Sequence, residues 1–265
     1  MTSIPSLPNP HRSRRRDLRT RDERAQAFHA MGREYAAVRP GYPQQLVSEL
    51  AQMCPSECHA VDIGAGTGIF TAALTDFCAS VIAVEPAEAM GRSRLDFVRW
   101  VQACGEDTGL PAGCADLVTY AQAWHWVDPK RAAIEAHRLL RGRGLLALVW
   151  NQLDVTQPWV HRLARIMRAG DVHSTTTPPA LPHHLFTPPE RIISTHAQYL
   201  TPAEIAALGR TRSSYVRASD LQKQRMAENL HWYVHDHLGY SETDVIELPY
   251  RCVAWVYRRA PIPRT

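Results

Sequence analysis

The sequence contains no run of 18 or more apolar residues, and this absence argues against a transmembrane helix. The arginine-rich start MTSIPSLPNPHRSRRRDLRTRDER is not followed by an apolar segment, so it does not have the form of a secretory signal. We therefore expect a cytoplasmic protein that does not engage a membrane.

Paired cysteines are also missing. The chain has six cysteines, none of them in a CxxC pair: Cys54, Cys58, Cys78, Cys104, Cys114 and Cys252. Without such pairs, reduced thiols are expected rather than a disulfide framework. Cys54, Cys58 and His59 lie close together, but no second ligand pair follows at the spacing of a zinc finger, so no metal site is expected.

The formal charge of +4 belongs to one segment of the chain. Seven arginines and three acids lie between His11 and Arg24, and the rest of the chain holds equal numbers of basic and acidic residues. A neutral body argues against nucleic acid as the main substrate. We expect residues 1–24 to be a disordered leader, with an electrostatic docking arm as the alternative.

Short apolar segments alternate with segments of helical spacing. They predict strands at 59–64, 80–86, 115–123, 145–151 and 247–260. They predict a helix at 22–37, a Pro-containing break at 39–43 and a second helix after this break. Further helices are predicted at 67–78, 87–100, 128–144, 201–216 and 219–240. The glycines at the end of 128–144 are expected to cap that helix. The pattern weakens between 151 and 200, where 174–190 reads as a Pro-rich loop. The fold class is therefore α/β: a Rossmann-like, doubly wound, mostly parallel sheet with helices on both faces and an antiparallel C-terminal strand at or near its edge.

A glycine-rich turn follows the first of these strands. It reads D-x-G-x-G-x-G, from Asp62 to Gly68, and opens a helix. A Walker-type phosphate loop needs a lysine that is absent near this turn. A dinucleotide fingerprint would need a third glycine where Ile69 stands, so that interpretation is weakened but remains open.

The turn resembles motif I of the class I S-adenosylmethionine-dependent methyltransferases. The resemblance continues in ADLVTYAQAWHWVD (115–128), similar to the fourth-strand motif, and in RLLRGRGLLALVWN (138–151), similar to the helix and strand that follow it. FHAMGREYAAVRPGYP (28–43) resembles the N-terminal cap of the UbiE-like, methyltransferase type 11 group. These motifs cover residues 28–151, and they imply S-adenosylmethionine as the cofactor.

The resemblance also implies the cofactor-binding residues. Glu85 matches the acid that holds the ribose hydroxyls, a role that also suits a carboxylate at this distance from the turn. Glu106, with Asp107 beside it, matches the acid that reaches the adenine amino group. Tyr35 and Arg39 belong to the cap that closes over the cofactor. The full predicted set is Tyr35, Arg39, Asp62, Gly64, Ala65, Gly66, Gly68, Glu85, Pro86, Glu106, Asp107 and Gln122.

The segment QAWHWVD (122–128) is the best candidate for chemistry at the methyl group. An imidazole has a reference pKa of about 6.5, so His125 is the candidate general base, with pocket lining or a structural role as alternatives. An aromatic face attracts a cation, which favours Trp126 over Trp124 for the side facing the sulfonium or substrate; core packing is the alternative for both. The predicted substrate-side residues are Trp124, Trp126, Trp150, Arg212 and Tyr215.

Three functions follow from this interpretation. The leading one is a methyltransferase acting on a small molecule, with oxygen in a carboxylic acid, a phenol or a natural-product intermediate as the favoured acceptor. The second is an RNA or protein methyltransferase that docks through the arginine-rich leader. The third is a non-catalytic cofactor-binding protein. The predicted organisation is the leader and one methyltransferase domain over 25–265, with a cap (25–50), a cofactor-binding half (51–151) and a substrate-side half (152–265).

Overall fold

The computed structural model describes residues 38–87, 95, 97–168 and 176–261. The strands are β1 (His59–Ile63), β2 (Ser80–Val84), β3 (Arg99–Val101), β4 (Ala115–Ala121), β5 (Leu140–Leu153), β6 (Glu190–Leu200) and β7 (Ile246–Arg258). The helices are α3 (Gln44–Met53), α4 (Ile69–Thr75), α5 (Pro129–Leu139), α6 (Pro158–Ile166), α7 (Pro202–Arg210), α8 (Ser213–Val216) and α9 (Asp220–His231), with a 3-10 turn η2 (Trp124–Trp126) and a π-helical turn η3 (Trp232–His237). The expected leader and the helix at 22–37 lie outside the described residues.

The chain divides into two compact units. The sheet unit comprises the described residues of Arg39–Gln152, His173–His196 and Arg251–Thr265. The helical unit comprises those of Met1–Val38, Leu153–Val172 and Ala197–Tyr250.

One sheet of seven strands has the order β3-β2-β1-β4-β5-β7-β6. Strand β1 pairs in parallel with β2 and β4, β2 with β3, and β4 with β5. The C-terminal strand β7 is antiparallel, so the predicted fold class is confirmed. The order of strands reverses between β1 and β4, and ligands of such sheets bind at this switch point, beyond the carboxyl ends of the strands.

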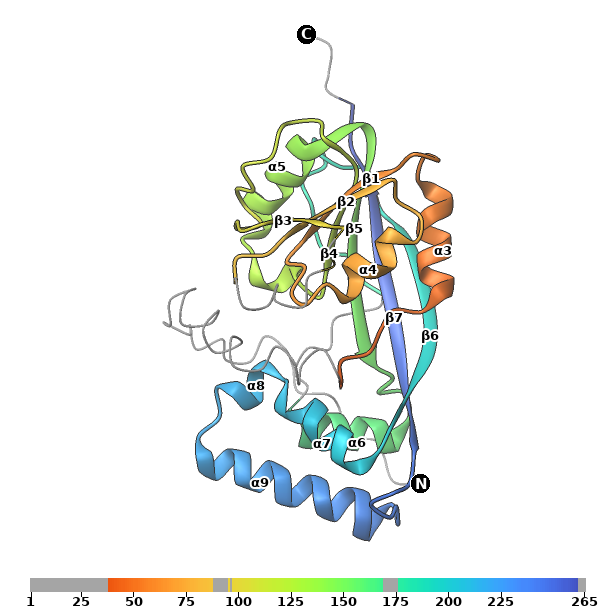
Figure 1. Ribbon diagram of the computed structural model, residues 1–265, viewed down its shortest axis with the longest axis vertical. Coiled ribbons are helices and arrows are strands. Elements are labelled where there is room, and N and C mark those ends of the chain that lie inside the picture. Colours follow the sequence, from red (N-terminus) through yellow and green to blue (C-terminus); the bar gives the residue numbers. More distant parts are fainter. Residues whose placement is uncertain (1–37, 88–94, 96, 169–175, 262–265) are drawn as a thin grey trace. The chain divides into compact units, whose positions relative to one another are not determined.

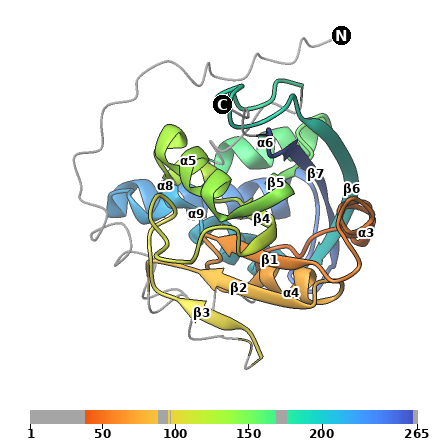
Figure 2. The same ribbon diagram turned by 90° about the horizontal axis from the view of Figure 1, so that it is seen from above.

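Side chains of the central strands alternate between two covered faces. Val61 and Ile63 of β1 pack into a core with Ala132 and Ala136 of α5. Ala60 of the same strand belongs to a second core, which it forms with residues of α3 and α4. Figures 1 and 2 show α5 on one side of these strands and α3 and α4 on the other. Because both faces are covered, the strands are apolar throughout, as parallel strands usually are.

The transition from α5 to β5 differs from the prediction. Asp128 caps the start of α5 by accepting hydrogen bonds from the backbone N–H groups of Lys130 and Arg131. The helix ends without a glycine cap, because Leu140 is extended and already opens β5. The glycines lie inside the strand, where the register with β4 shifts between Ala115 and Leu117. Their role is therefore in a strand irregularity rather than in a helix cap.

The predicted helix at 87–100 is wrong at its end. Arg99–Val101 forms the short strand β3, which pairs in parallel with β2. Pairing with a neighbouring strand therefore overrides the helical spacing of these residues. Residues 88–94 and 96 of that segment lie outside the described part of the chain. Strand β6 and helix α6, in the stretch of weak pattern, were not predicted at all.

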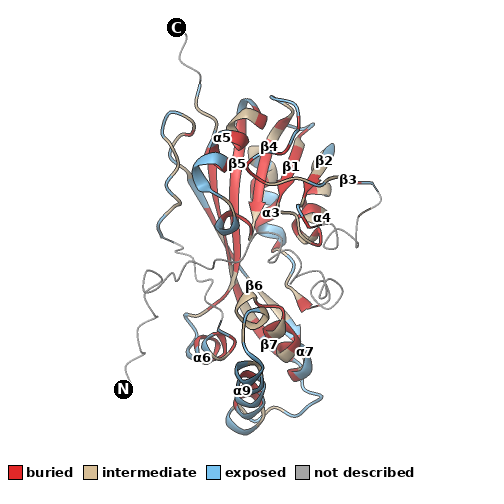
Figure 3. Cartoon of the chain, turned by 90° about the vertical axis from the view of Figure 1, so that its left-hand side faces the viewer, coloured by how far each residue is buried: buried red, intermediate tan, exposed pale blue. Residues whose placement is uncertain are grey.

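The helical unit has a core of its own. Apolar side chains from α6, α7 and α9 form it, among them Leu163, Leu208 and Leu230. The capping box of α7 has Thr201 and Glu204 bonded to each other's backbone N–H groups. In α9 only Met226 and Leu230 are buried, so most of this helix faces solvent (Figure 3). Helices form in both predicted segments: 201–216 is divided into α7 and α8, and 219–240 holds α9 and η3 and is helical only as far as His237.

Candidate functional site

The glycine turn after β1 has a backbone that only glycine adopts easily. Gly64, Gly66 and Gly68 have φ angles of 70°, 58° and 87°, in the left-handed region. A Cβ atom built on Gly64 would lie 2.5 Å from the Cβ of Ala123, which follows β4. The turn and the segment after β4 are thus in direct contact at the switch point of the sheet, with no room for a side chain between them.

Glu85, at the end of β2, is bonded to this turn. One of its carboxylate oxygens accepts the backbone N–H of Gly66 at 2.9 Å, and the other accepts that of Ala87 at 3.0 Å. Each carboxylate oxygen has a second lone pair, so both can accept a further hydrogen bond from a ligand. Burial raises the pKa of Glu85, while the two backbone bonds lower it.

Asp62 lies beneath the turn and is 1% exposed. Its two carboxylate oxygens accept the hydroxyl groups of Thr71, on α4, and Thr119, on β4, both at 2.7 Å. Burial raises the pKa of Asp62 to about 6, against the lowering effect of the two hydroxyls. Asp62 therefore joins β1, α4 and β4 at the base of the turn, in the manner of a positioning residue.

Thr67 provides a buried polar atom within the turn. It is 8% exposed, and its Oγ1 has no hydrogen-bond partner among the described residues. Buried hydroxyls are normally satisfied, and an unsatisfied one at a site calls for a ligand or a water. Nothing in the glycine pattern singles out Thr67, and sequence reasoning missed it.

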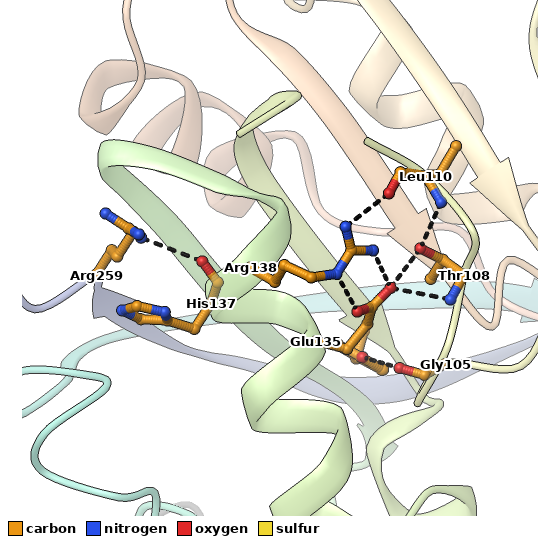
Figure 4. Close-up of polar contacts among 8 residues, drawn as sticks. Gly105, Thr108, Leu110, Glu135, His137, Arg138 and Arg259 are labelled. Carbon is orange, nitrogen blue, oxygen red and sulfur yellow. Dashed lines mark hydrogen bonds and ion pairs between the residues drawn. The ribbon is translucent and has the colours of Figure 1, made fainter. Parts of the chain in front are cut away.

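The loop that carries Glu106 is fastened to α5 (Figure 4). Glu135 accepts the backbone N–H and the hydroxyl of Thr108 at 2.9 and 2.6 Å, and Arg138 donates to both oxygens of Glu135 and to the carbonyl of Leu110. Burial would raise the pKa of Glu135, but the bonds from Arg138 and Thr108 outweigh it, and the pKa is lowered. This network gives the loop a fixed path close to the switch point.

Glu106 itself is nearly buried on this loop. Its Oε1 accepts the backbone N–H of Asp128 at 2.9 Å, the residue that caps α5. The backbone of the neighbouring Asp107 forms an isolated antiparallel β-bridge with that of Cys104. The Tyr120 hydroxyl donates to the Gly105 carbonyl at 2.9 Å, and a Cβ on Gly105 would lie 2.9 Å from Ile63, at the end of β1. The loop is thus packed against the carboxyl ends of β1 and β4.

The segment after β4 presents the predicted catalytic group to solvent. Gln122 has a φ of 57°, a rare conformation for a residue other than glycine and one found often at functional sites. His125 is exposed and Trp126 is 39% exposed, with ring centroids 4.9 Å apart. Trp124 instead packs into the core, with its ring edge-on to that of Tyr120.

Gln122 belongs to a polar cluster whose members Gly41 and His196 were not predicted. The side-chain amide of Gln122 donates to the carbonyl of Asn151, on β5. The amide of Asn151 donates to the Gly41 carbonyl at 2.7 Å, and its Oδ1 accepts the Nε2–H of His196, on β6, at 3.0 Å. Burial lowers the pKa of His196, which favours its neutral form. The cluster connects three strands with the loop that enters α3.

The other predicted residues are distributed as follows. Ala65 and Pro86 lie beside Gly66 and Glu85, Arg39 opens the sheet unit and is half-buried, and Trp150 is a core residue. Arg212 and Tyr215 belong to the helical unit, where Arg212 is buried and Lys223 lies over the Tyr215 ring. Tyr35 lies outside the described residues.

Within the described ranges no three His, Cys, Asp or Glu side chains are grouped so as to hold a metal ion. In that part of the chain no helix combines the length and apolar character needed to cross a bilayer.

Known proteins resemble this chain in sequence and in fold. The family model of the methyltransferase domain matches residues 61–148, from β1 into β5. An uncharacterized methyltransferase of Mycobacterium bovis is 33% identical over 82% of this chain and 88% of its own length. An uncharacterized methyltransferase-like protein of Schizosaccharomyces pombe is 26% identical over 86% and 93%. A solved structure from Anaeromyxobacter dehalogenans, assigned as a type II methyltransferase, has a TM-score of 0.60 at 24% identity and covers 84% of this chain and 98% of its own.

Proposed function

Because the chain belongs to the class I S-adenosylmethionine-dependent methyltransferases of the type 11 group, we propose that it methylates an oxygen of a small molecule. The cofactor and the enzyme class follow from the family. The acceptor is the part that has to be inferred from the residues.

The residues around the glycine turn fit S-adenosylmethionine. The turn leaves backbone bare at Gly64, where a side chain would collide with Ala123, and Thr67 offers a buried hydroxyl with no partner among the described residues. Glu85 has carboxylate lone pairs for the ribose hydroxyls, and Glu106 is held on a fixed loop. When bound, the cofactor supplies an electrophilic methyl group on a sulfonium, so the protein mainly binds and orients the reactants.

The observation that carries the proposal is the exposed pair of rings after β4. His125 and Trp126 come two and three residues after Ala123, which touches the turn. A hydroxyl or carboxyl acceptor must lose its proton during transfer unless it is already ionised, and an imidazole can take that proton near neutral pH. The face of Trp126 can pack against a small acceptor or face the sulfonium. Methyltransferases that act on amino groups of bases or of glutamine have an NPPY-type motif after the fourth strand. This chain has AQAWHW at that place, so an amino acceptor is less supported.

The alternative is an RNA or protein methyltransferase that docks through residues 1–24. The observation that favours it is the concentration of seven arginines between His11 and Arg24. Removing residues 1–24 separates the two functions, because transfer to a small acceptor should survive the truncation and transfer to a polyanion should not.

The proposal is tested by methyl transfer from radiolabelled S-adenosylmethionine to panels of carboxylic acids, phenols, amines, RNA and proteins. We expect transfer to an acid or phenol with the full chain and with the truncated one. For a phenol acceptor, His125→Asn should lower kcat by roughly 10²- to 10⁴-fold and remove the acidic limb of the pH profile. His183→Asn, an exposed histidine elsewhere, is the matched control. Transfer only to RNA or protein, abolished by the truncation, would overturn the proposal.

A further inference from the structure

A cavity of about 420 Å³ lies in the helical unit between α6 and α9. Four of its lining residues are arginines, three near the end of α6 and one on α9: Arg162, Arg165, Arg168 and Arg225. We call this cavity the arginine groove. Its volume is in the range of sites for small molecules.

Helical spacing explains why these side chains meet. On α6, Arg162, Arg165 and Ile166 are three and four residues apart and share one face. On α9, Gln222 and Arg225 have the same relation. The guanidinium groups are exposed, whereas Met226, between the two helices, is 7% exposed. The groove therefore has an apolar base and a cationic rim.

Within the described ranges, no carboxylate is paired with these arginines. Among the described residues, none of the four arginines has an ion pair or a side-chain hydrogen bond. The acids of α9 have other partners: Glu228 accepts from Gln224 at 2.8 Å, and Asp220 lies 3.6 Å from Lys223. The helical unit is not short of acids, since Asp and Glu equal Lys and Arg in number over 153–168 and 197–250. Four of the eight Lys and Arg residues of these ranges line the groove, and none of its lining residues is an acid.

Arg168 directly follows the C-cap residue of α6, Met167. Arg168 has a φ of 48°, which is strained for a residue with a side chain. An arginine pays this conformational cost at the groove, where glycine or asparagine would be the usual residue after a helix. Like charges three residues apart on α6 also destabilise the helix. The repulsion between the arginines is relieved if an anionic ligand fills the groove.

We propose that the arginine groove binds a small organic diphosphate, with its phosphates on the guanidinium rim and its apolar body over Ile166 and Met226. A guanidinium forms paired hydrogen bonds with two phosphate oxygens, and four of them match the several charges of a diphosphate. The groove belongs to the helical unit, whereas the cofactor residues belong to the sheet unit. Diphosphate binding is therefore a function in addition to the proposed methyl transfer.

The test is isothermal titration of the full chain with inorganic pyrophosphate and with geranyl diphosphate. We expect saturable binding of both, tighter for geranyl diphosphate because its chain covers the apolar base. The double variant Arg165→Gln, Arg225→Gln should weaken binding about tenfold or more, since each lost contact is a charge-assisted hydrogen bond. Arg165→Lys, Arg225→Lys keeps the charge but loses the paired geometry, so its binding should be intermediate.

Arg143→Gln is the matched control, because Arg143 is an exposed arginine of β5 with no ion pair to another described residue. Titration with S-adenosylhomocysteine checks the fold of each variant and should be unchanged by all of them. Pyrophosphate binding that the double Gln variant leaves intact would overturn the proposal, because the ligand would then be held elsewhere, such as on the leader. Binding only to vesicles containing phosphatidic acid, or only to an RNA oligonucleotide, would also overturn it, since the ligand would then be a membrane or a nucleic acid.

Discussion

The two units differ in whether their charged side chains have partners among the described residues. In the sheet unit the acids near the switch point are held by several neutral or cationic donors: Asp62 by two hydroxyls, Glu85 by two N–H groups, and Glu135 by Thr108 and Arg138. In the helical unit four arginines surround a cavity, and within the described residues none of them has a carboxylate partner.

This difference separates a site organised by the fold from one organised by its ligand. Acids that are already bonded keep their geometry without a ligand, and such preorganisation favours precise placement of a reacting group. Arginines that repel one another gain most when an anion arrives. Substitutions of these acids in the sheet unit should therefore reduce stability or cofactor affinity. Removing positive charge from the groove should weaken anion binding but should not reduce stability.

The largest effect is expected for Glu85→Ala. The change removes the acceptor for the ribose hydroxyls and for the N–H groups of Gly66 and Ala87. Affinity for S-adenosylhomocysteine should fall by roughly 10²- to 10⁴-fold, since hydrogen bonds to a charged group contribute about 1.5–3 kcal/mol each. Isothermal titration with S-adenosylhomocysteine measures this affinity. Glu190→Ala, which breaks only an exposed ion pair with Arg258, is the control and should bind normally.

Glu135→Ala should reduce stability the most. Glu135 is 5% exposed, and its loss removes the acceptor of the Thr108 N–H and the carboxylate partner of Arg138, which keeps only its bond to the Leu110 carbonyl. Because Arg138 retains contact with solvent, we expect a loss of about 3 kcal/mol, at the lower end for a buried pair. Urea unfolding measures the free energy, and Glu190→Ala again provides the exposed comparison. A loss below about 1 kcal/mol would place this pair with ordinary surface ion pairs.

Asp62→Asn should change how stability depends on pH. The raised pKa means that the folded protein binds the proton of Asp62 more tightly than the unfolded chain does. Wild-type stability, relative to the Asn variant, should therefore fall as the pH rises from about 4 to about 6 and stay level above that. The difference should be roughly 2–3 kcal/mol, from about 1.4 kcal/mol per pKa unit. Parallel curves for the two proteins in thermal or urea unfolding would show that Asp62 is not desolvated.

Local patterns made the glycine turn, Glu85 and most elements of the parallel sheet predictable. An apolar strand, a bare turn and an acid after the next strand are all features of neighbouring residues. The partners of Asp62 were not predictable in this way, because Thr119 lies 57 residues away and only the β1–β4 pairing brings it near. The short strand β3 and the glycines of β5 likewise depend on pairing with another strand, which overrides local helical preference.

The arginine groove was hidden for the same reason. Arg165 and Arg225 have ordinary helical spacing in their own segments, and an exposed arginine alone predicts no function. Only the packing of α6 against α9 places them around one cavity. The predicted roles of His125, Trp126, Arg212 and Tyr215 stay predictions, because they depend on an acceptor.

The smallest effect expected, and the one of opposite sign, is that of Arg225→Glu. A glutamate on α9 would face the arginines of α6, replacing repulsion by attraction, and should stabilise the protein by about 0.5 kcal/mol in low salt. The gain should shrink as salt is added, because exposed charges are screened. Arg143→Glu, in the sheet unit, should give no such gain. Urea unfolding at low and high salt distinguishes these outcomes. A destabilised Arg225→Glu protein would mean that the groove arginines already have favourable partners, and the contrast between the two units would then disappear.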